Sequence, residues 1–152
     1  MHREDQFIPH LVMNNCPAAI EFYKIVLGAA EGHTMMSPDG KKVLHGELIL
    51  DGHKLFVSDE FQKSEGGTLK SPQTLGGTTA RVTLEVDDAD RIVARALAAG
   101  ATVSMPVQDM FWGARYGKIV DPFGHEWGIN QQLQRQSEAE TEARASDFFT
   151  KQ

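Results

Sequence analysis

Residues 109–130 have the sequence DMFWGARYGKIVDPFGHEWGIN, which holds both tryptophans of the chain and one of its two tyrosines. The first part is too aromatic for an ordinary solvent loop and too interrupted by glycine for a helix. The second part predicts a hairpin, with a strand over 118–120, a turn over 121–124 and a returning strand over 126–130. Proline presets φ at the second position of such a turn, and glycine accepts a positive φ at the fourth. We therefore expect residues 110–116 to form an aromatic flap that covers a pocket, seals a subunit contact or makes an edge of the core.

Two parts of the chain repeat one pattern of secondary structure. Residues 7–14 predict a strand, and residues 17–27 predict an amphipathic helix that ends at Gly28. Strands are expected over 32–36 and 43–58, and the same order of elements returns after residue 80. The apolar positions of the two predicted helices match at an offset of 70 residues, with Phe22, Tyr23, Val26 and Leu27 corresponding to Ile92, Val93, Ala96 and Leu97. A repeat at this scale implies two like modules.

Several segments also resemble a known family. The run MFWG-R-YG-I-DPFGHEW resembles the C-terminal signature of the PhnB-like branch of the vicinal oxygen chelate superfamily, which includes glyoxalase I, extradiol dioxygenases and the fosfomycin and bleomycin resistance proteins. AAIEFYKIVLGA at 18–29 resembles the first-helix signature of that family, HGELILDG at 45–52 a central hairpin, and LEVDDAD at 84–90 the start of the second module. The resemblance covers residues 7–131. It implies an α+β fold in which two tandem βαβββ modules form a curved mixed sheet around a cup, with the helices on the outer face.

The pattern and the resemblance together predict the organisation of the chain. We expect a first βαβββ module at 7–60, an inter-module loop at 61–79, a second module at 80–131 and a polar tail at 132–152. The loop is rich in glycine, serine and threonine, which is typical of a connector or a mobile segment. The tail is expected to be helical or disordered, and a helical tail would allow its two phenylalanines to dock on the domain or on a partner subunit.

The composition excludes some classes of protein. The chain has 152 residues and a net charge of −6, which argues against nucleic-acid and anionic-membrane partners. No apolar run approaches the roughly 20 residues of a membrane-spanning helix, and the N-terminus lacks the apolar core of a signal peptide. We therefore expect a cytoplasmic protein. The single cysteine, Cys16, excludes an intrachain disulfide and a cysteine-rich zinc site, and we expect a buried or capping thiol rather than one activated by the helix dipole.

The resemblance also implies a divalent-metal site with one ligand on each of four inward strands. In this chain the four positions fall at or next to His10, near Ser58, near Arg81 and on Gly128. Arginine would repel a cation and glycine has no side chain, so His10 alone remains a plausible ligand. We therefore expect no metal and no other cofactor. A non-standard divalent-metal site remains as an alternative, formed by His10, His45 and Glu47 if the first and third strands are neighbours.

The predicted cup combines aromatic rings with charges. On the strand over 43–50, Leu44, Gly46, Leu48 and Leu50 make the better core face, and the other face carries His45 and Glu47, about 7 Å apart. An aromatic wall stacks on planar or cationic groups, and Arg81 would hold a carboxylate or a phosphate. A charge network of Arg81 and Glu85 within the sheet is the alternative, and His125 and Glu126 are expected at the surface or in the flap. The expected ligand-binding residues are His10, His45, Glu47, Phe56, Arg81, Trp112, Arg115 and Tyr116, with Thr83 and Glu85 beside them.

Three functions follow from these expectations. The first is a homodimeric protein that binds a small planar or anionic molecule without a metal, as the resistance proteins sequester a drug. The second is a metal-dependent lyase, isomerase or dioxygenase with rearranged ligands. The third is a non-catalytic dimeric interaction domain. No glycine-rich cofactor loop follows a strand and opens a helix, and whether the chain catalyses a reaction stays open.

Overall fold

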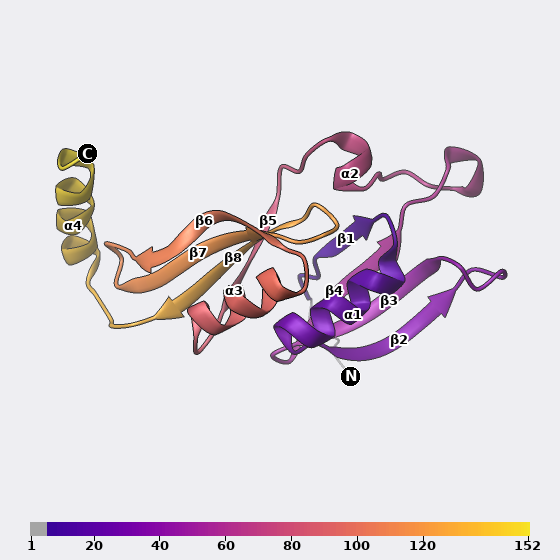
Figure 1. The fold of residues 1–152 in the computed structure, drawn as a ribbon, viewed down its shortest axis with the longest axis horizontal. Coiled ribbons are helices and arrows are strands. Elements are labelled where there is room, and N and C mark those ends of the chain that lie inside the picture. Colours follow the sequence, from indigo (N-terminus) through magenta and orange to yellow (C-terminus); the bar gives the residue numbers. More distant parts are fainter. Residues whose placement is uncertain (1–5) are drawn as a thin grey trace. The chain divides into compact units, whose positions relative to one another are not determined.

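The computed structural model describes residues 6–152 and divides the chain into two compact units, Met1–Thr78 (unit 1) and Thr79–Gln152 (unit 2). Each unit contains a four-stranded mixed sheet, and in each a strand is followed by a helix and then by three strands (Figure 1). This confirms the predicted α+β class with two tandem βαβββ modules. In the described part of the chain, no helix is long and apolar enough to span a membrane.

The βαβββ module of unit 1 is a four-stranded sheet with helix α1 on one face. The elements are β1 (His10–Met13), α1 (Cys16–Leu27), β2 (Ala30–Met36), β3 (Val43–Leu50) and β4 (His53–Asp59). The strand order is β1-β4-β3-β2, with β1 parallel to β4 and the other pairs antiparallel. The core lies between helix and sheet, where Tyr23, Leu48 and Val57 are fully buried.

The start and end of α1 agree with the sequence. Asn15 caps the helix through its side-chain oxygen, which accepts a hydrogen bond from the backbone N–H of Ala18 at 3.4 Å. Gly28 ends it with a φ of 70°. Cys16, the first helical residue, is buried, and burial together with the Asp59 carboxylate raises the pKa of its thiol to about 12. The thiol is therefore not activated by the helix dipole.

The alternation predicted along β3 is interrupted by a bulge at Leu44. Met35 of β2 pairs with His45 and Met36 pairs with Val43, so Leu44 has no partner on β2. The bulge turns Val43 into the core and leaves Leu44 exposed, the reverse of the expectation for these two residues. The assignments of His45 and Leu48 to opposite faces are unaffected.

The connector between the modules contains more regular structure than its composition predicts. It includes a short 3-10 helix, η1 (Lys63–Glu65), and a one-turn helix, α2 (Pro72–Leu75). The Glu60 carboxylate accepts hydrogen bonds from the Ser71 backbone N–H at 2.6 Å and from the Thr74 hydroxyl at 2.7 Å, which hold the start of α2 to the end of β4. The connector is therefore not a structureless loop.

Unit 2 repeats the arrangement of unit 1. Its elements are β5 (Arg81–Glu85), α3 (Ala89–Ala98), β6 (Thr102–Asp109), β7 (Ala114–Val120) and β8 (Glu126–Gln132). The strand order is β5-β8-β7-β6, with β5 parallel to β8. Asp88 caps α3 by accepting a hydrogen bond from the Arg91 backbone N–H at 3.1 Å. The outer strand β6 contains Pro106, and its pairing with β7 is irregular at two places.

The predicted turn over 121–124 is present, and a buried carboxylate fixes it. Asp121 accepts hydrogen bonds from the backbone N–H groups of Phe123 and His125 and from the indole of Trp127, at 2.9, 3.0 and 2.9 Å. Gly124 has the expected positive φ, 90°. The flap, in contrast, is shorter than predicted. Strand β7 begins at Ala114, so a turn of four residues, 110–113, takes the place of the flap, and Arg115 and Tyr116 belong to the strand.

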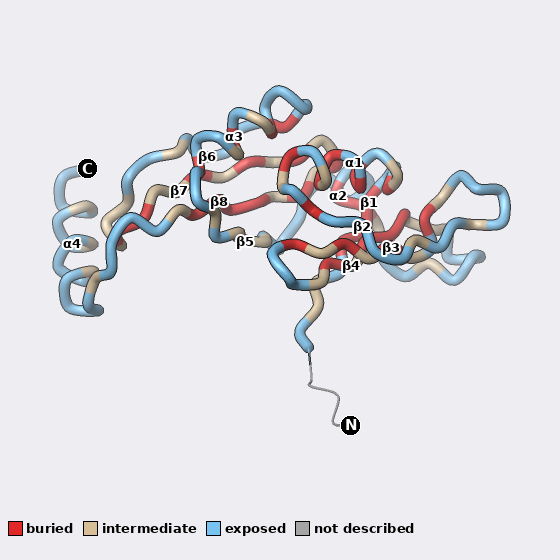
Figure 2. The backbone as a smooth tube through the Cα atoms, turned by 90° about the horizontal axis from the view of Figure 1, so that it is seen from below, coloured by how far each residue is buried: buried red, intermediate tan, exposed pale blue. Residues whose placement is uncertain are grey.

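The tail is helical. Helix α4 (Glu138–Thr150) begins at Ser137 with a capping box that includes Glu140. The ring of Phe148 lies 5.4 Å from the ring of Phe111, and that of Phe149 lies 6.0 Å from it. The tail thus docks on the turn 110–113 of its own unit. No residue of α4 is buried (Figure 2).

Candidate ligand-binding faces

In unit 2 the residues of each strand alternate between the face that α3 covers and the opposite face, which we call the open face of unit 2. Arg115 and Gln131 point to α3, because Arg115 binds Asp90 at 2.7 Å and the Gln131 side chain accepts a hydrogen bond from the Ala89 backbone N–H at 3.0 Å. Tyr116 and Asn130, the neighbours of these residues in the strands, therefore lie on the open face.

An ion pair marks one part of this open face. The guanidinium of Arg81 hydrogen-bonds the Glu126 carboxylate, and the two residues pair across β5 and β8. The contact lowers the pKa of Glu126, and a hydrogen bond from the Ser104 hydroxyl at 3.2 Å acts in the same direction. The pKa of Arg81 is raised, chiefly by Glu126 and to a lesser extent by Tyr116. Arg81 thus carries a fixed positive charge beside a phenol.

Aromatic rings and an amide lie next to the ion pair. The Trp112 and Tyr116 rings are 5.6 Å apart in an edge arrangement. Both carboxylate oxygens of Glu85 accept hydrogen bonds from the Asn130 amide at 3.0 Å, and the Trp112 indole donates to the Asn130 carbonyl oxygen at 3.5 Å. Glu85 thus binds a neutral amide, and the partner of Arg81 is Glu126, so the two residues of the alternative charge network do not pair with one another.

Gly128 makes room for these groups. A Cβ atom at residue 128 would lie 2.6 Å from the Tyr116 hydroxyl and 2.7 Å from the Thr83 hydroxyl. Both distances are shorter than a carbon–oxygen contact permits, so the absence of a side chain at 128 allows Tyr116 to reach β5. The sequence motif places a metal ligand at this position, and here a phenol fills the space.

Three rings gather on the open face of unit 1, the face opposite α1. The His45 and Phe56 ring centroids are 4.6 Å apart, and His10 lies 6.3 Å from His45 and 6.2 Å from Phe56. The Nε2 atom of His10 is 2.9 Å from the Ser58 hydroxyl. Burial and the neighbouring His45 lower the pKa of His10. The neutral imidazole is thereby favoured, and the cluster is aromatic in character.

Glu47 is not joined to this cluster as a metal ligand would be. Its carboxylate binds the Lys54 ammonium at 3.2 Å. The condition for a site of His10, His45 and Glu47 was that the first and third strands are neighbours, and β4 lies between them. The condition for that alternative site is therefore not met.

The four positions implied by the sequence motif do not fit a divalent cation. His10 and Ser58 hydrogen-bond one another, Arg81 is a cation held by Glu126, and Gly128 offers no donor. Divalent ions of this class need several imidazole or carboxylate ligands. Within residues 6–152, no three His, Cys, Asp or Glu side chains gather into a group that could hold a metal ion. A metal-free protein nevertheless stays a prediction.

Arg115 does not belong with the other predicted ligand residues. Its guanidinium lies on the α3 side of the sheet and binds Asp90 and Asp109 at 2.7 and 3.0 Å, which raises its pKa. The sequence placed it in the flap, but the early start of β7 turns it to the other face. The structure brings Arg81, Trp112 and Tyr116 together on one open face, and His10, His45 and Phe56 on the other.

Sequence reasoning missed two members of the unit 2 cluster. Glu126 was expected at the surface or in the flap, and Asn130 was not among the predicted ligand residues. Both lie two residues from Gly128 in β8 and therefore share its strand face. The alternation of side chains along this strand could have predicted that they face the same side as Gly128.

Known proteins resemble this chain in sequence and in fold. A family model described as the Glyoxalase/Bleomycin resistance protein/Dioxygenase superfamily matches residues 6–129. Rv0887c of Mycobacterium tuberculosis is 38% identical over 143 residues, which cover 94% of this chain and 84% of that protein. At5g48480 of Arabidopsis thaliana is 34% identical over 116 residues, or 72% of this chain and 67% of that protein.

Solved structures give the same picture of the fold. The X-ray structure of the At5g48480 product aligns with a TM-score of 0.66 at 28% identity and covers 84% of this chain and 98% of that one. FosX of Listeria monocytogenes, a fosfomycin resistance protein solved with Mn(II) and sulfate, aligns with a TM-score of 0.64 and covers 95% and 99% of the two chains. Its identity to this chain is 15%, so the likeness concerns the fold alone.

Proposed function

We propose that this chain, which belongs to the glyoxalase/bleomycin resistance protein/dioxygenase superfamily, binds a small planar anion on the open face of unit 2 without a metal ion. One observation carries the proposal: a cation, a phenol and an indole lie together on a sheet face that no helix of unit 2 covers. The Arg81 guanidinium would take the anionic group, and the rings of Trp112 and Tyr116 would contact the planar part.

The ion pair of Arg81 does not prevent this binding. Side-chain exposure is 38% for Arg81 and 23% for Glu126, so solvent screens the contact. Ion pairs of this kind contribute about 0–1 kcal/mol. A ligand anion therefore competes with Glu126 at small cost, and the planar group adds the dispersion contact that a bare anion lacks. His10, His45, Glu47 and Phe56 stay predicted ligand residues of unit 1.

The proposal is tested with 2-naphthoate, a planar aromatic carboxylate, in a titration monitored by tryptophan fluorescence. Its neutral isostere, 2-naphthamide, serves as the comparison ligand. We expect naphthoate to bind more tightly by about tenfold, which is the effect of roughly 1.4 kcal/mol from a charge-assisted contact. Arg81→Gln should remove the difference, and Glu126→Gln should tighten naphthoate binding because the competing carboxylate is gone.

The control variant is Lys54→Gln, which removes a cation from a similar ion pair on the open face of unit 1. It should leave the preference for naphthoate unchanged. Equal affinity for the two ligands, or a preference that survives Arg81→Gln, would refute the proposal.

The metal-dependent alternative is addressed by elemental analysis of the purified protein. We expect no stoichiometric divalent metal, because neither His10 with Ser58 in unit 1 nor Arg81 with Gly128 in unit 2 offers the donors that one needs. A stoichiometric metal would overturn the metal-free part of the proposal and favour a lyase, isomerase or dioxygenase. Two intact units with no ligand and no metal would favour the third function, an interaction domain.

A further inference from the structure

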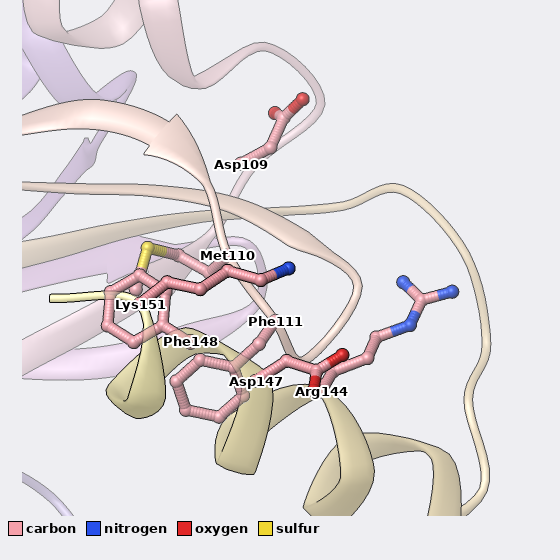
Figure 3. Close-up of a pocket in the computed structure, with 7 residues that line it drawn as sticks. All are labelled: Asp109, Met110, Phe111, Arg144, Asp147, Phe148 and Lys151. Atoms are coloured by element: carbon pink, nitrogen blue, oxygen red, sulfur yellow. The ribbon is translucent and has the colours of Figure 1, made fainter.

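Helix α4 rests on the turn that carries Trp112. The face turned inward consists of Thr141, Ala145 and Phe148, which recur at helical spacing and are the partly covered residues of the helix. The ring centroids of Phe148 and Phe111 are 5.4 Å apart. A shallow hollow of 340 Å³ remains between helix and turn. Figure 3 shows the two side chains among the residues that line this hollow. Helix α4 is therefore docked through few contacts, and its packing against the turn 110–113 leaves the hollow open.

Polar contacts join the segment before α4 to the same turn. The Gly113 carbonyl oxygen accepts hydrogen bonds from the backbone N–H groups of Leu133 and Gln134 at 3.0 and 3.1 Å. The Gln136 side chain is assigned the amide orientation in which its oxygen faces donors and its nitrogen faces acceptors. Its oxygen then accepts a hydrogen bond from the Gly113 N–H at 2.9 Å, and its nitrogen donates one to the Phe111 carbonyl oxygen at 3.0 Å. The Gln136 oxygen also accepts from Arg144 of α4 at 2.9 Å. The turn and the tail thus share one hydrogen-bonded network.

A continuous series of rings leads from the tail to the open face of unit 2. After the Phe148–Phe111 contact, Phe111 lies 4.9 Å from Trp112 in an edge arrangement, and Trp112 lies 5.6 Å from Tyr116. Aromatic pairs at these distances constrain the orientation of each ring. Movement of Phe111 would therefore move Trp112, which is its neighbour in the chain and in space.

We propose that α4 is a latch on the turn 110–113, and that Phe111 and Phe148 are positioning residues which hold the Trp112 indole on the open face of unit 2. Undocking α4 frees the turn and removes Trp112 from Tyr116 and Asn130. The consequence for ligands rests on the function proposed above, whereas the latch itself does not. The tail is in this way a control point for the site that acts through Phe111.

The latch is tested in the chain of 152 residues with Phe148→Ala and acrylamide quenching of tryptophan fluorescence. Trp127 is 1% exposed and shielded, so added quenching reports on Trp112. We expect the quenching constant to rise about twofold with a red shift of the emission, because a freed turn exposes its indole. Phe148→Tyr retains the ring and should restore the wild-type value. Trp112→Phe should abolish the effect of Phe148→Ala.

Phe7→Ala is the matched control, because Phe7 is 97% exposed and lies in unit 1. It removes an exposed phenylalanine without touching the turn and should leave quenching unchanged. Unchanged quenching in Phe148→Ala would overturn the latch. Should this variant fail to fold, Phe148→Leu and Phe111→Leu take its place, since both keep apolar bulk and remove a ring.

A second measurement separates the latch from the proposed function. Where 2-naphthoate binds the wild-type chain, Phe148→Ala should weaken that binding severalfold while the midpoint of urea unfolding stays constant. A parallel loss of midpoint and affinity would assign Phe148 a structural role and refute positioning. Increased quenching together with no naphthoate binding to the wild-type chain would support the latch and refute the ligand proposal.

Discussion

At the scale of single residues, the missing side chain of Gly128 decides where Tyr116 lies. The space that a side chain at 128 would occupy contains the Tyr116 hydroxyl, which lies near Arg81. Glycine at this position is therefore the condition for the proximity of the Tyr116 phenol and the Arg81 guanidinium.

Gly128→Ala is predicted to force Tyr116 away from β5. The added Cβ overlaps the phenol oxygen and the Thr83 hydroxyl, and overpacking of this kind costs about 1–3 kcal/mol. The loss should be smaller in a Tyr116→Ala background, where the larger obstacle is absent. Urea unfolding of the four members of this cycle gives the coupling energy, and strictly additive losses would show that the two residues do not compete for space.

Side-chain identity could be inferred from the sequence more readily than side-chain direction. The motif led to Arg81, Trp112 and Tyr116, which lie together. Arg115 was misplaced, because a strand that begins at Ala114 instead of near Lys118 turns it toward α3. Strand ends depend on pairing with β6 and β8, and that information lies outside the local sequence.

At the scale of elements, the connector contains two short helices that its composition did not predict. Residues 61–79 contain the glycine and serine typical of a loop, yet Glu60 organises them from outside the segment. Hydrogen bonds from Ser71 and Thr74 lower the pKa of Glu60, so its docking contact is present at neutral pH and is lost as the pH falls through that lowered pKa. Nothing in the local sequence around Glu60 predicts that its carboxylate binds Ser71, eleven residues later.

Glu60→Gln is predicted to loosen the connector while leaving the sheet of unit 1 intact. A neutral amide accepts weaker hydrogen bonds than a carboxylate, so α2 should detach more often. Trypsin should then cleave after Lys63 and Lys70 several times faster than in the wild-type chain, as followed by mass spectrometry. Glu21→Gln, which changes an exposed carboxylate on α1, should have the wild-type rate. No acceleration in Glu60→Gln would show that other contacts hold α2.

Helices α1 and α3 were the elements that sequence predicted best. Helix α1 has an asparagine cap, a proline in its first turn and a glycine after its last residue, and each signal acts within a few residues. The bulge at Leu44 had no such signal, because it arises from the pairing of β3 with β2. Alternation predicts the faces of β3 correctly from His45 onward and fails at the two residues before it.

At the scale of the whole molecule, the repeat is visible in the sequence itself. An offset of 70 residues between two apolar helix patterns predicted two like modules, and each unit has the expected helix and four strands. The tail was the part that composition left undecided. Its docking depends on Phe111, in a turn that the sequence assigned to a longer flap.

The homodimer stays a prediction of the whole chain. The superfamily resemblance suggested it, and the described surfaces offer exposed apolar side chains such as Met35, Leu97 and Val103. Light scattering on the purified protein is expected to give twice the chain mass at micromolar concentration. A single chain mass would refute the dimer, and with it any function that depends on a subunit contact, such as the dimeric interaction domain.

The outer strands β2 and β6 bear on a different property, resistance to aggregation. A regular strand at the edge of a sheet presents free N–H and C=O groups to which another chain adds. Both strands pair irregularly with their neighbours, and β6 also contains Pro106, which lacks an N–H group. Neither edge is a regular template for further strands. We therefore expect contact between copies at these two edges to involve side-chain packing rather than extension of the sheet.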